Sequence, residues 1–217
     1  MINQVPVDTR RRILEAAMHL FWEKGFGSTS IADILSRAGI NSGSLYHFFP
    51  GKQDLLIAVL DTYIGGIREM LLVPNWRGVA DPIEKIWKLM DGYRAALVQT
   101  DCTYGCPIGS LALELHEPDP AVRERLAKNF SNWTDAIEEC LDAAGKRVPR
   151  GTNKRALAEF VLTTMEGGVM LARSYRDIGY FDRAIDQLKE HFNRLLKPAK
   201  SPARSGAQRS KKGKLHA

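Results

Sequence analysis

A chain of 217 residues, 44% hydrophobic and 26% charged, has the composition of an ordinary globular protein and is long enough to bury a sizeable core. No apolar run reaches the ~18 residues that a membrane helix needs, and the N-terminal segment MINQVPVDTRRR lacks the apolar stretch of a secretion signal. The chain has three cysteines, and an odd number in a chain of this size argues against a disulfide framework. We therefore expect a cytoplasmic protein with no membrane partner.

The net charge of +6 is concentrated at the two ends of the chain. Residues 197–217 carry seven Lys/Arg and no acid, and residues 1–52 carry six Lys/Arg against four Asp/Glu. Residues 53–196 have 18 Lys/Arg against 21 Asp/Glu, so this larger part is mildly acidic. A nucleic-acid surface is therefore expected near the ends and not on the central body.

Apolar residues recur at helical spacing along the whole chain, and no alternating strand pattern is found. The sequence therefore predicts an all-α fold of about nine helices. Their approximate ranges are 9–24, 30–38, 41–49, 51–73, 82–99, 105–115, a segment capped at 117–120 and ending near 144, 152–178 and 182–196.

Capping residues support several of these boundaries. Ser30 with Asp33 three residues later forms a capping-box pattern, Asn41 is a good N-cap, and Asp81-Pro82 places an N-cap before proline at the first helical position. We expect Pro74 to stop the fourth helix, Thr152 to cap the eighth, Gly179 to close it, and Asp182 to cap the ninth.

Residues 25–56 have the layout of a helix-turn-helix reader of DNA. The turn Ala38-Gly39-Ile40-Asn41 separates two short helices, and the second of these, Ser42–Phe48, would place its N-terminal end against the bases. The start of the preceding helix offers free amides to a phosphate. The candidate DNA contacts are Thr29, Ser30, Ser42, Gly43, Ser44, Tyr46, His47 and Lys52. On the helical pattern alone, a solvated three-helix domain with ordinary caps is an equal alternative.

The same stretch resembles the TetR family of bacterial repressors. The matching residues are Gly25-Phe26, Thr29, Ile34, Ala38-Gly39-Ile40, Gly43, Leu45-Tyr46-His47-Phe48-Phe49, Lys52 and Leu55-Leu56. The chain length and the number of predicted helices also fit, so the resemblance covers nearly the whole chain. Ala32 and Ser42 depart from the family pattern, since basic or polar residues are frequent at these positions; this predicts fewer charged contacts to the operator.

The resemblance implies three regions: a helix-turn-helix DNA-binding domain at 1–52, a ligand-sensing and dimerisation domain at 53–196, and a basic tail at 197–217 that we expect to be disordered. The tail would either add non-specific phosphate contacts or be a solvated extension, and we favour the second.

The resemblance also implies a homodimeric repressor on a palindromic double-stranded DNA operator, released by a small-molecule or thiol-reactive effector. We expect no cofactor and no enzymatic activity, because neither a Gly-rich phosphate loop nor a Ser-His-Asp arrangement can be placed. A ligand carrier that keeps a non-functional DNA domain is the alternative.

The last two predicted helices carry apolar stripes that are candidates for the dimer interface. In TetR-like proteins these two helices pair with their two-fold mates in a four-helix bundle, which is also what a palindrome requires. Both stripes could instead face the chain's own core, and this must be partly true of the first. The candidate interface residues are Phe160, Thr164, Gly168, Leu171, Ile185, Leu188 and Phe192.

The helices of the body would enclose an effector pocket in this family. The candidate lining residues are Trp87, Tyr93, Tyr104, Cys106, Phe130, Trp133 and Met165, although any single aromatic residue among them is more often plain core. A metal site at the cluster Glu114, His116, Glu117 and Asp119 is not expected, since one histidine beside two prolines indicates an exposed capping loop.

The segment from Gly105 to Glu114 resembles a branch of TetR-like regulators with the pattern Gly-Cys-x-x-Gly-x-Leu-Ala-x-Glu. Some members of that branch respond to electrophiles through the cysteine, and others bind organic acids or aromatic compounds. Pro107 places Cys106 at a helix N-cap, where the helix dipole would lower the thiol pKa, and Cys102 could resolve an oxidised Cys106. We favour the alternative, in which Cys106 is a packed core residue and the effector binds reversibly.

Overall fold

The structure is a computed structural model that describes residues 5–196, with side chains from residue 9 onward. Within this range the chain forms ten α-helical segments and no strand, which confirms the predicted all-α class. If the uninterrupted helical stretch 52–76 is counted as one helix, the number is nine, as expected. None of the described helices is both long enough and apolar enough to cross a membrane. The tail 197–217, which we expect to be disordered, lies outside the described residues.

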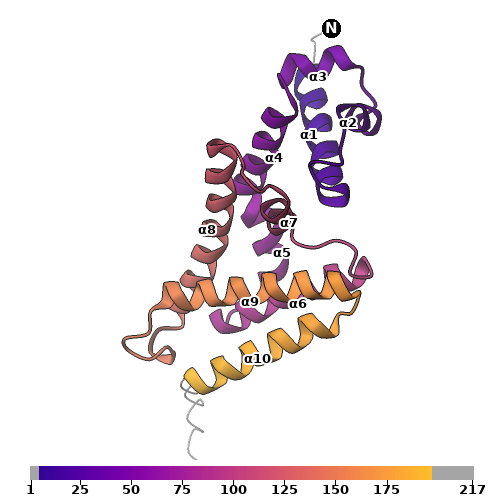
Figure 1. Cartoon of the computed structure of the whole chain (residues 1–217). Helices are drawn as coiled ribbons and strands as arrows, with labels where there is room; N and C mark the ends of the chain where they lie inside the picture. Colours follow the sequence, from indigo (N-terminus) through magenta and orange to yellow (C-terminus); the bar gives the residue numbers. More distant parts are fainter. Residues whose placement is uncertain (1–4, 197–217) are drawn as a thin grey trace, which may run out of the picture.

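The first four helices meet at one end of the molecule (Figure 1). These are α1 (Val5–Lys24), α2 (Ile31–Ala38), α3 (Ser42–Phe48) and α4 (Lys52–Ile67), and Ile13, Ile34, Leu45 and Leu55 are fully buried between them. The same core cluster includes Leu60 of α4 and takes in residues of α7 and α8. The small core therefore does not stop at residue 52, where the sequence analysis divides the two domains.

We predict that Pro74 stops the fourth helix, but the helical stretch that begins at Lys52 runs on to Trp76. A π-helical turn, Arg68–Leu72, joins α4 to α5 (Val73–Trp76), and the amide of Val73 donates to the carbonyl of Arg68. Proline lacks an N–H and would clash with the carbonyl four residues earlier in a regular helix. The wider turn changes the hydrogen-bond register just before Pro74, so that the chain remains helical past the proline.

The body consists of five longer segments and one 3₁₀ turn. Their bounds are α6 (Pro82–Gln99), α7 (Pro107–Glu114), α8 (Pro120–Ala143), the 3₁₀ turn Gly145–Arg147, α9 (Lys154–Tyr175) and α10 (Gly179–Leu195). The predicted N-caps Ser30, Asn41 and Asp81 are confirmed, since each side chain accepts a hydrogen bond from a backbone amide of the first helical turn. Asp119 caps α8 in the same way.

Three predicted boundaries are wrong near the C-terminus. Asn153, not Thr152, caps α9, and the helix ends at Arg176, which adopts a left-handed conformation with φ 51°. Gly179 begins α10 instead of closing α9, and Asp182 lies in the first turn of α10, where its carboxylate pairs with Arg94 of α6 at 2.8 Å. The left-handed residue that ends α9 is thus Arg176, three residues before Gly179, where we predict the break.

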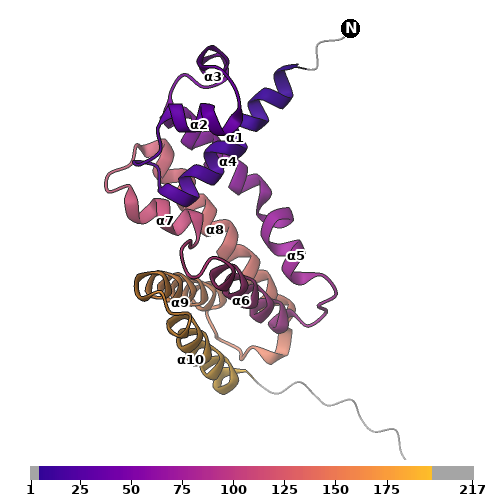
Figure 2. The same cartoon turned by 90° about the vertical axis from the view of Figure 1, so that its right-hand side faces the viewer.

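The last two helices pack side by side at the end of the molecule opposite α3 (Figure 2). Gly168 of α9 permits this close approach, because a Cβ atom there would lie 3.2 Å from the ring of Phe181 and 3.4 Å from Ala184 on α10. The spacing of small and large residues on the two helices therefore serves packing within the chain.

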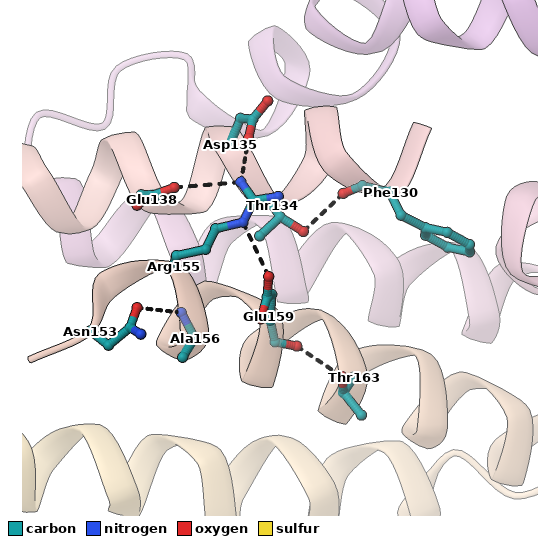
Figure 3. A network of polar contacts seen from close by, with 9 residues as sticks. All are labelled: Phe130, Thr134, Asp135, Glu138, Asn153, Arg155, Ala156, Glu159 and Thr163. Atoms are coloured by element: carbon teal, nitrogen blue, oxygen red, sulfur yellow. Dashed lines mark hydrogen bonds and ion pairs between the residues drawn. The ribbon is translucent and has the colours of Figure 1, made fainter. Parts of the chain in front are cut away.

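Arg155 ties the start of α9 to α8 (Figure 3). Its guanidinium pairs with Asp135, with Glu138 at 3.4 Å and with Glu159 at 3.2 Å. Since all of these side chains are at least partly exposed, the network is worth little in stability, but it joins the first turn of α9 to α8.

Candidate DNA-binding surface and effector cavity

The turn between α2 and α3 is held from several directions. Gly39 ends α2 in the left-handed conformation with φ 63°, and Asn41 caps α3 by accepting from the Ser44 amide. From α1, the Arg12 guanidinium donates to the carbonyls of Ala38 at 2.5 Å and Gly39 at 3.2 Å. These contacts satisfy carbonyls that the helix end leaves free, and they fix the direction in which α3 leaves the turn.

Most residues on the outer face of α3 are exposed. Tyr46 is 55% exposed, and Ser42, Gly43 and His47 are also exposed, whereas Leu45 points inward and is fully buried. Ser44 is half-buried, and its hydroxyl donates to the Asn41 side chain at 3.0 Å.

The side chain of Thr29 is too buried to contact DNA, although the sequence places it among the candidate contacts. It is 1% exposed, and its hydroxyl donates to the carbonyls of Gly25 at 2.7 Å and Leu20 at 3.2 Å. The Ser30 hydroxyl is exposed but is engaged with Asp33 in the capping box. Thr29 therefore orders the loop before α2, which is a structural role that the sequence pattern cannot separate from a phosphate contact.

Lys52 is half-buried at the start of α4. Its ammonium lies 4.2 Å from the centre of the Phe26 ring, a cation–π contact. Burial lowers the pKa of Lys52 below its ordinary value, and the nearby Glu114 opposes this shift. Lys52 thus packs on the loop after α1.

A cavity of about 210 Å³ lies between α4, α6, α7, α8 and α9. Its walls are largely apolar and aromatic, and are formed by Tyr63, Ile67, Met70, Leu71, Tyr93, Cys106, Pro107, Ile108, Asn129, Phe130, Trp133, Leu162 and Glu166. Two adjoining spaces, of about 510 Å³ and about 380 Å³, share walls with it, and Cys106 borders all three. Such a concave, mostly apolar space with a few polar groups is typical of a small-molecule site.

The predicted pocket residues divide into two groups. Tyr93, Cys106, Phe130 and Trp133 line the cavity, and Tyr104 lines one of the adjoining spaces. Two predictions are wrong. Trp87 packs edge-on against Phe192 at 5.0 Å between ring centres, away from the cavity, and Met165 is fully buried in the core on a different face of α9 from Glu166.

Tyr63 and Glu166 are cavity residues that the sequence analysis missed. A helical stripe that includes a glutamate is usually read as ending at a solvated face, so only the tertiary structure shows that this carboxyl points inward. Burial raises the pKa of Glu166 above its ordinary value, and the Cys106 thiol opposes the shift by hydrogen bonding to the carboxyl. The Tyr93 hydroxyl, also in the cavity, accepts from the Trp133 indole at 3.2 Å.

Cys106 is at the N-cap of α7, as predicted, and its sulfur accepts from the Gly109 amide at 3.5 Å. The expectation that this position lowers the thiol pKa is wrong. Burial and the neighbouring Glu166 carboxyl raise the pKa of Cys106 well above its ordinary value, and outweigh the helix amides. Cys102 is also buried and has a raised pKa, and it belongs to the other core cluster. The arrangement therefore favours two packed, protonated thiols.

The α7 helix connects the cavity to the DNA-binding helices. At its C-terminal end, the Glu114 carboxylate accepts from the amides of Phe26 at 2.8 Å and Gly27 at 2.6 Å. Before its N-terminal end, the Gly105 carbonyl accepts from the Trp22 indole at 2.7 Å. Both partners belong to α1 or to the loop after it. The α7 segment therefore contacts the helix-turn-helix region at two points, and its N-cap Cys106 borders the cavity.

The candidate dimer residues also divide. Phe160 is 45% exposed and Leu171 39% exposed on α9, and Thr164 is half-buried between them. Gly168, Ile185, Leu188 and Phe192 are buried within the chain, so their assignment to the interface is wrong. The exposed apolar stripe that remains runs along α9 and continues to Tyr175, which is 61% exposed.

These features define a helix-turn-helix protein with a cavity in its helical body. The family model "Bacterial regulatory proteins, tetR family" matches residues 13–59, and the model "Transcriptional regulator LmrA/YxaF-like, C-terminal domain" matches residues 82–187. The HTH-type regulator Rv0196 of Mycobacterium tuberculosis is 32% identical over 201 residues, which are 90% of this chain and 97% of that protein.

The regulator LmrA of Bacillus subtilis is 29% identical over 173 residues, covering 76% of this chain and 86% of that protein. A TetR regulator from Chloroflexus aurantiacus has a solved structure that superimposes with a TM-score of 0.78 at 26% identity, covering 89% of this chain and 98% of the other. This chain belongs to the TetR family of DNA-binding transcriptional regulators.

Proposed function

We propose that this chain is a homodimeric repressor that binds a palindromic operator through α3 and leaves it when a small molecule occupies the cavity. The observation that carries this proposal is the position of α7. Its N-cap Cys106 borders the cavity, and its last residue, Glu114, holds the two amides of the loop after α1. The α4 helix also touches both regions, because it packs on α1 and its Tyr63 and Ile67 line the cavity.

A ligand acts on this arrangement by preferring one position of α7 over another. Regulation needs only a difference of a few kcal/mol in the ligand's affinity for the two states. Because Glu114 and Trp22 link α7 to the base of the DNA-binding helices, a displacement of α7 changes the separation of the two α3 helices in a dimer. Operator half-sites one helical turn apart require a separation of ~34–36 Å.

The effector in this proposal is a reversible ligand. A thiol reacts as the thiolate, and the raised pKa of the buried Cys106 disfavours that form at neutral pH. Dimerisation uses the exposed stripe of α9 around Phe160 and Leu171. Packing of this stripe against a second copy of the chain would remove large apolar side chains from water. DNA contacts come from Ser42, Gly43, Tyr46 and His47, with the free amides at the start of α2 and the Lys52 charge beside them.

The test is operator binding by Tyr46→Ala. We expect it to abolish sequence-specific binding to DNA from upstream of its own gene, measured by fluorescence anisotropy, while the circular dichroism spectrum and melting temperature remain unchanged. His116→Ala is the control, because His116 is exposed on the loop between α7 and α8, far along the chain from α3. Normal operator binding by Tyr46→Ala would refute the assignment of α3 as the reading helix.

A further inference from the structure

Glu166 is an unusual residue for the wall of an apolar cavity. Its Oε1 atom is buried and has no hydrogen-bond partner. A buried acceptor without a partner costs free energy, and a carboxylate costs more than a neutral group. Such a group is explained if a ligand supplies the missing donor.

No Lys, Arg or His lines the cavity that contains this carboxyl. Arg173 lines the adjoining space, which Glu166 also borders, and its guanidinium donates to the Ser110 hydroxyl at 3.0 Å and to the Thr103 carbonyl at 3.4 Å. The cavity therefore presents one acidic group, and Arg173 is hydrogen-bonded to neutral groups of α7 and of the loop before it. An anionic ligand would be repelled by this carboxylate, and a neutral ligand that donates a hydrogen bond to it would leave its charge unpaired.

The chain makes room for this carboxyl. A Cβ atom on Gly109 of α7 would lie 2.2 Å from Oε2 of Glu166, so a larger residue at this point of α7 would require the carboxyl to shift. The walls of the same cavity also include Tyr63, Tyr93 and Trp133, and aromatic rings of these types attract cations. A cavity of about 210 Å³ is somewhat larger than the ~150 Å³ that holds one benzene ring, and the adjoining spaces extend it.

We propose that the effector of this protein is an aromatic amine, bound as the cation, whose ammonium donates to Oε1 of Glu166 while its one or two rings lie among Tyr63, Tyr93 and Trp133. This inference rests on the proposed function only in calling the ligand an effector. Pairing with the ammonium offsets part of the free energy that burial of the Glu166 carboxylate costs.

The probes are three naphthalenes that differ in one group: 2-(1-naphthyl)ethylamine, 2-(1-naphthyl)ethanol and 1-naphthylacetate. Their binding to the full-length protein at pH 7.5 is measured by isothermal titration calorimetry. We expect the amine to bind about thirtyfold more tightly than the alcohol, as for a desolvated charge pair, and the acetate to bind more weakly than either. Equal binding of amine and alcohol, tighter binding of the acetate, or no binding of the amine would overturn the inference.

Glu166→Gln keeps the shape of the side chain and removes its charge. It should weaken amine binding about thirtyfold and change alcohol binding less than threefold. Glu159→Gln is the control, because Glu159 lies on the same helix but is exposed and paired with Arg155. Unchanged amine binding by Glu166→Gln would overturn the inference, and the comparison of the three probes on the unaltered protein does not depend on how this variant folds.

Operator binding without ligand, measured separately by anisotropy, distinguishes this inference from the proposed function. A protein that binds its operator but does not prefer the amine would refute the ligand class alone. A protein that prefers the amine but binds no DNA sequence specifically would refute the regulator alone.

Discussion

Replacement of Glu114 by Gln tests the link between the cavity and the DNA-binding helices. The carboxylate accepts from the Phe26 amide at 2.8 Å and the Gly27 amide at 2.6 Å. Glutamine keeps one acceptor of nearly the same shape but turns an NH₂ group against the second amide. A hydrogen bond to a charged group contributes about 1.5–3 kcal/mol, and partial exposure of this contact reduces that value. We therefore expect the free energy of unfolding to fall by about 1–2 kcal/mol.

The assay is urea unfolding followed by circular dichroism, with thermal melting as a second measurement. For a chain of this size, each kcal/mol corresponds to a fall of about 2–4 °C in Tm. Glu117→Gln is the matched control, because Glu117 is exposed on the next turn of chain after α7 and should give no change. In a binding assay, we also expect Glu114→Gln to weaken the release of operator by any ligand of the cavity, with ligand affinity unchanged.

A Glu114→Gln protein as stable as the unaltered chain, with an undiminished response to ligand, would refute the account of α7 as the connecting element. Loss of ligand binding itself would also count against it, since Glu114 does not line the cavity.

Four further predictions concern the body. Glu166→Gln should raise the free energy of unfolding at pH 7, measured by urea titration, and this gain should disappear below about pH 4.5. The reason is that a carboxyl whose pKa is raised in the folded state costs stability at any pH where the same carboxyl is ionised in the unfolded chain. An equal effect at pH 4 and pH 7 would contradict this prediction. Cys106 should react with a chromogenic disulfide reagent at a rate that keeps rising above pH 9, because its thiol pKa is raised. A rate that reaches a plateau below pH 8 would instead show that Cys106 is a thiolate at neutral pH. Gly168→Val should lower the free energy of unfolding by about 1–3 kcal/mol through overpacking against Phe181, whereas Leu171→Lys should leave it unchanged at low protein concentration and yield monomers in analytical ultracentrifugation.

The helices of this protein could be predicted from the sequence because their signals are local. Ser30 with Asp33, Asn41, and Asp81 before Pro82 each satisfy amides within their own first turn, and the structure confirms all three caps. Gly179 misled the prediction because a glycine signals a break in the helix without saying on which side the chain resumes. The left-handed residue is Arg176 instead.

The site could be predicted only in part because its central contacts join residues far apart in the chain. Glu114 meets Phe26 across 88 positions, and no spacing rule connects them. The apolar period of α10 shows that one face of this helix is buried, but it does not show which partner covers that face. The sequence therefore predicts Ile185, Leu188 and Phe192 at a dimer interface, whereas they are buried within the chain. The charge of Glu166 concealed its inward position for the same reason.

Selection of binding sequences from a random duplex library tests the central claim most directly. The account predicts that the full-length protein enriches one palindromic sequence with half-sites about one helical turn apart, and that Tyr46→Ala enriches none. No enriched sequence with the unaltered protein, or the same sequence enriched by Tyr46→Ala, would contradict it.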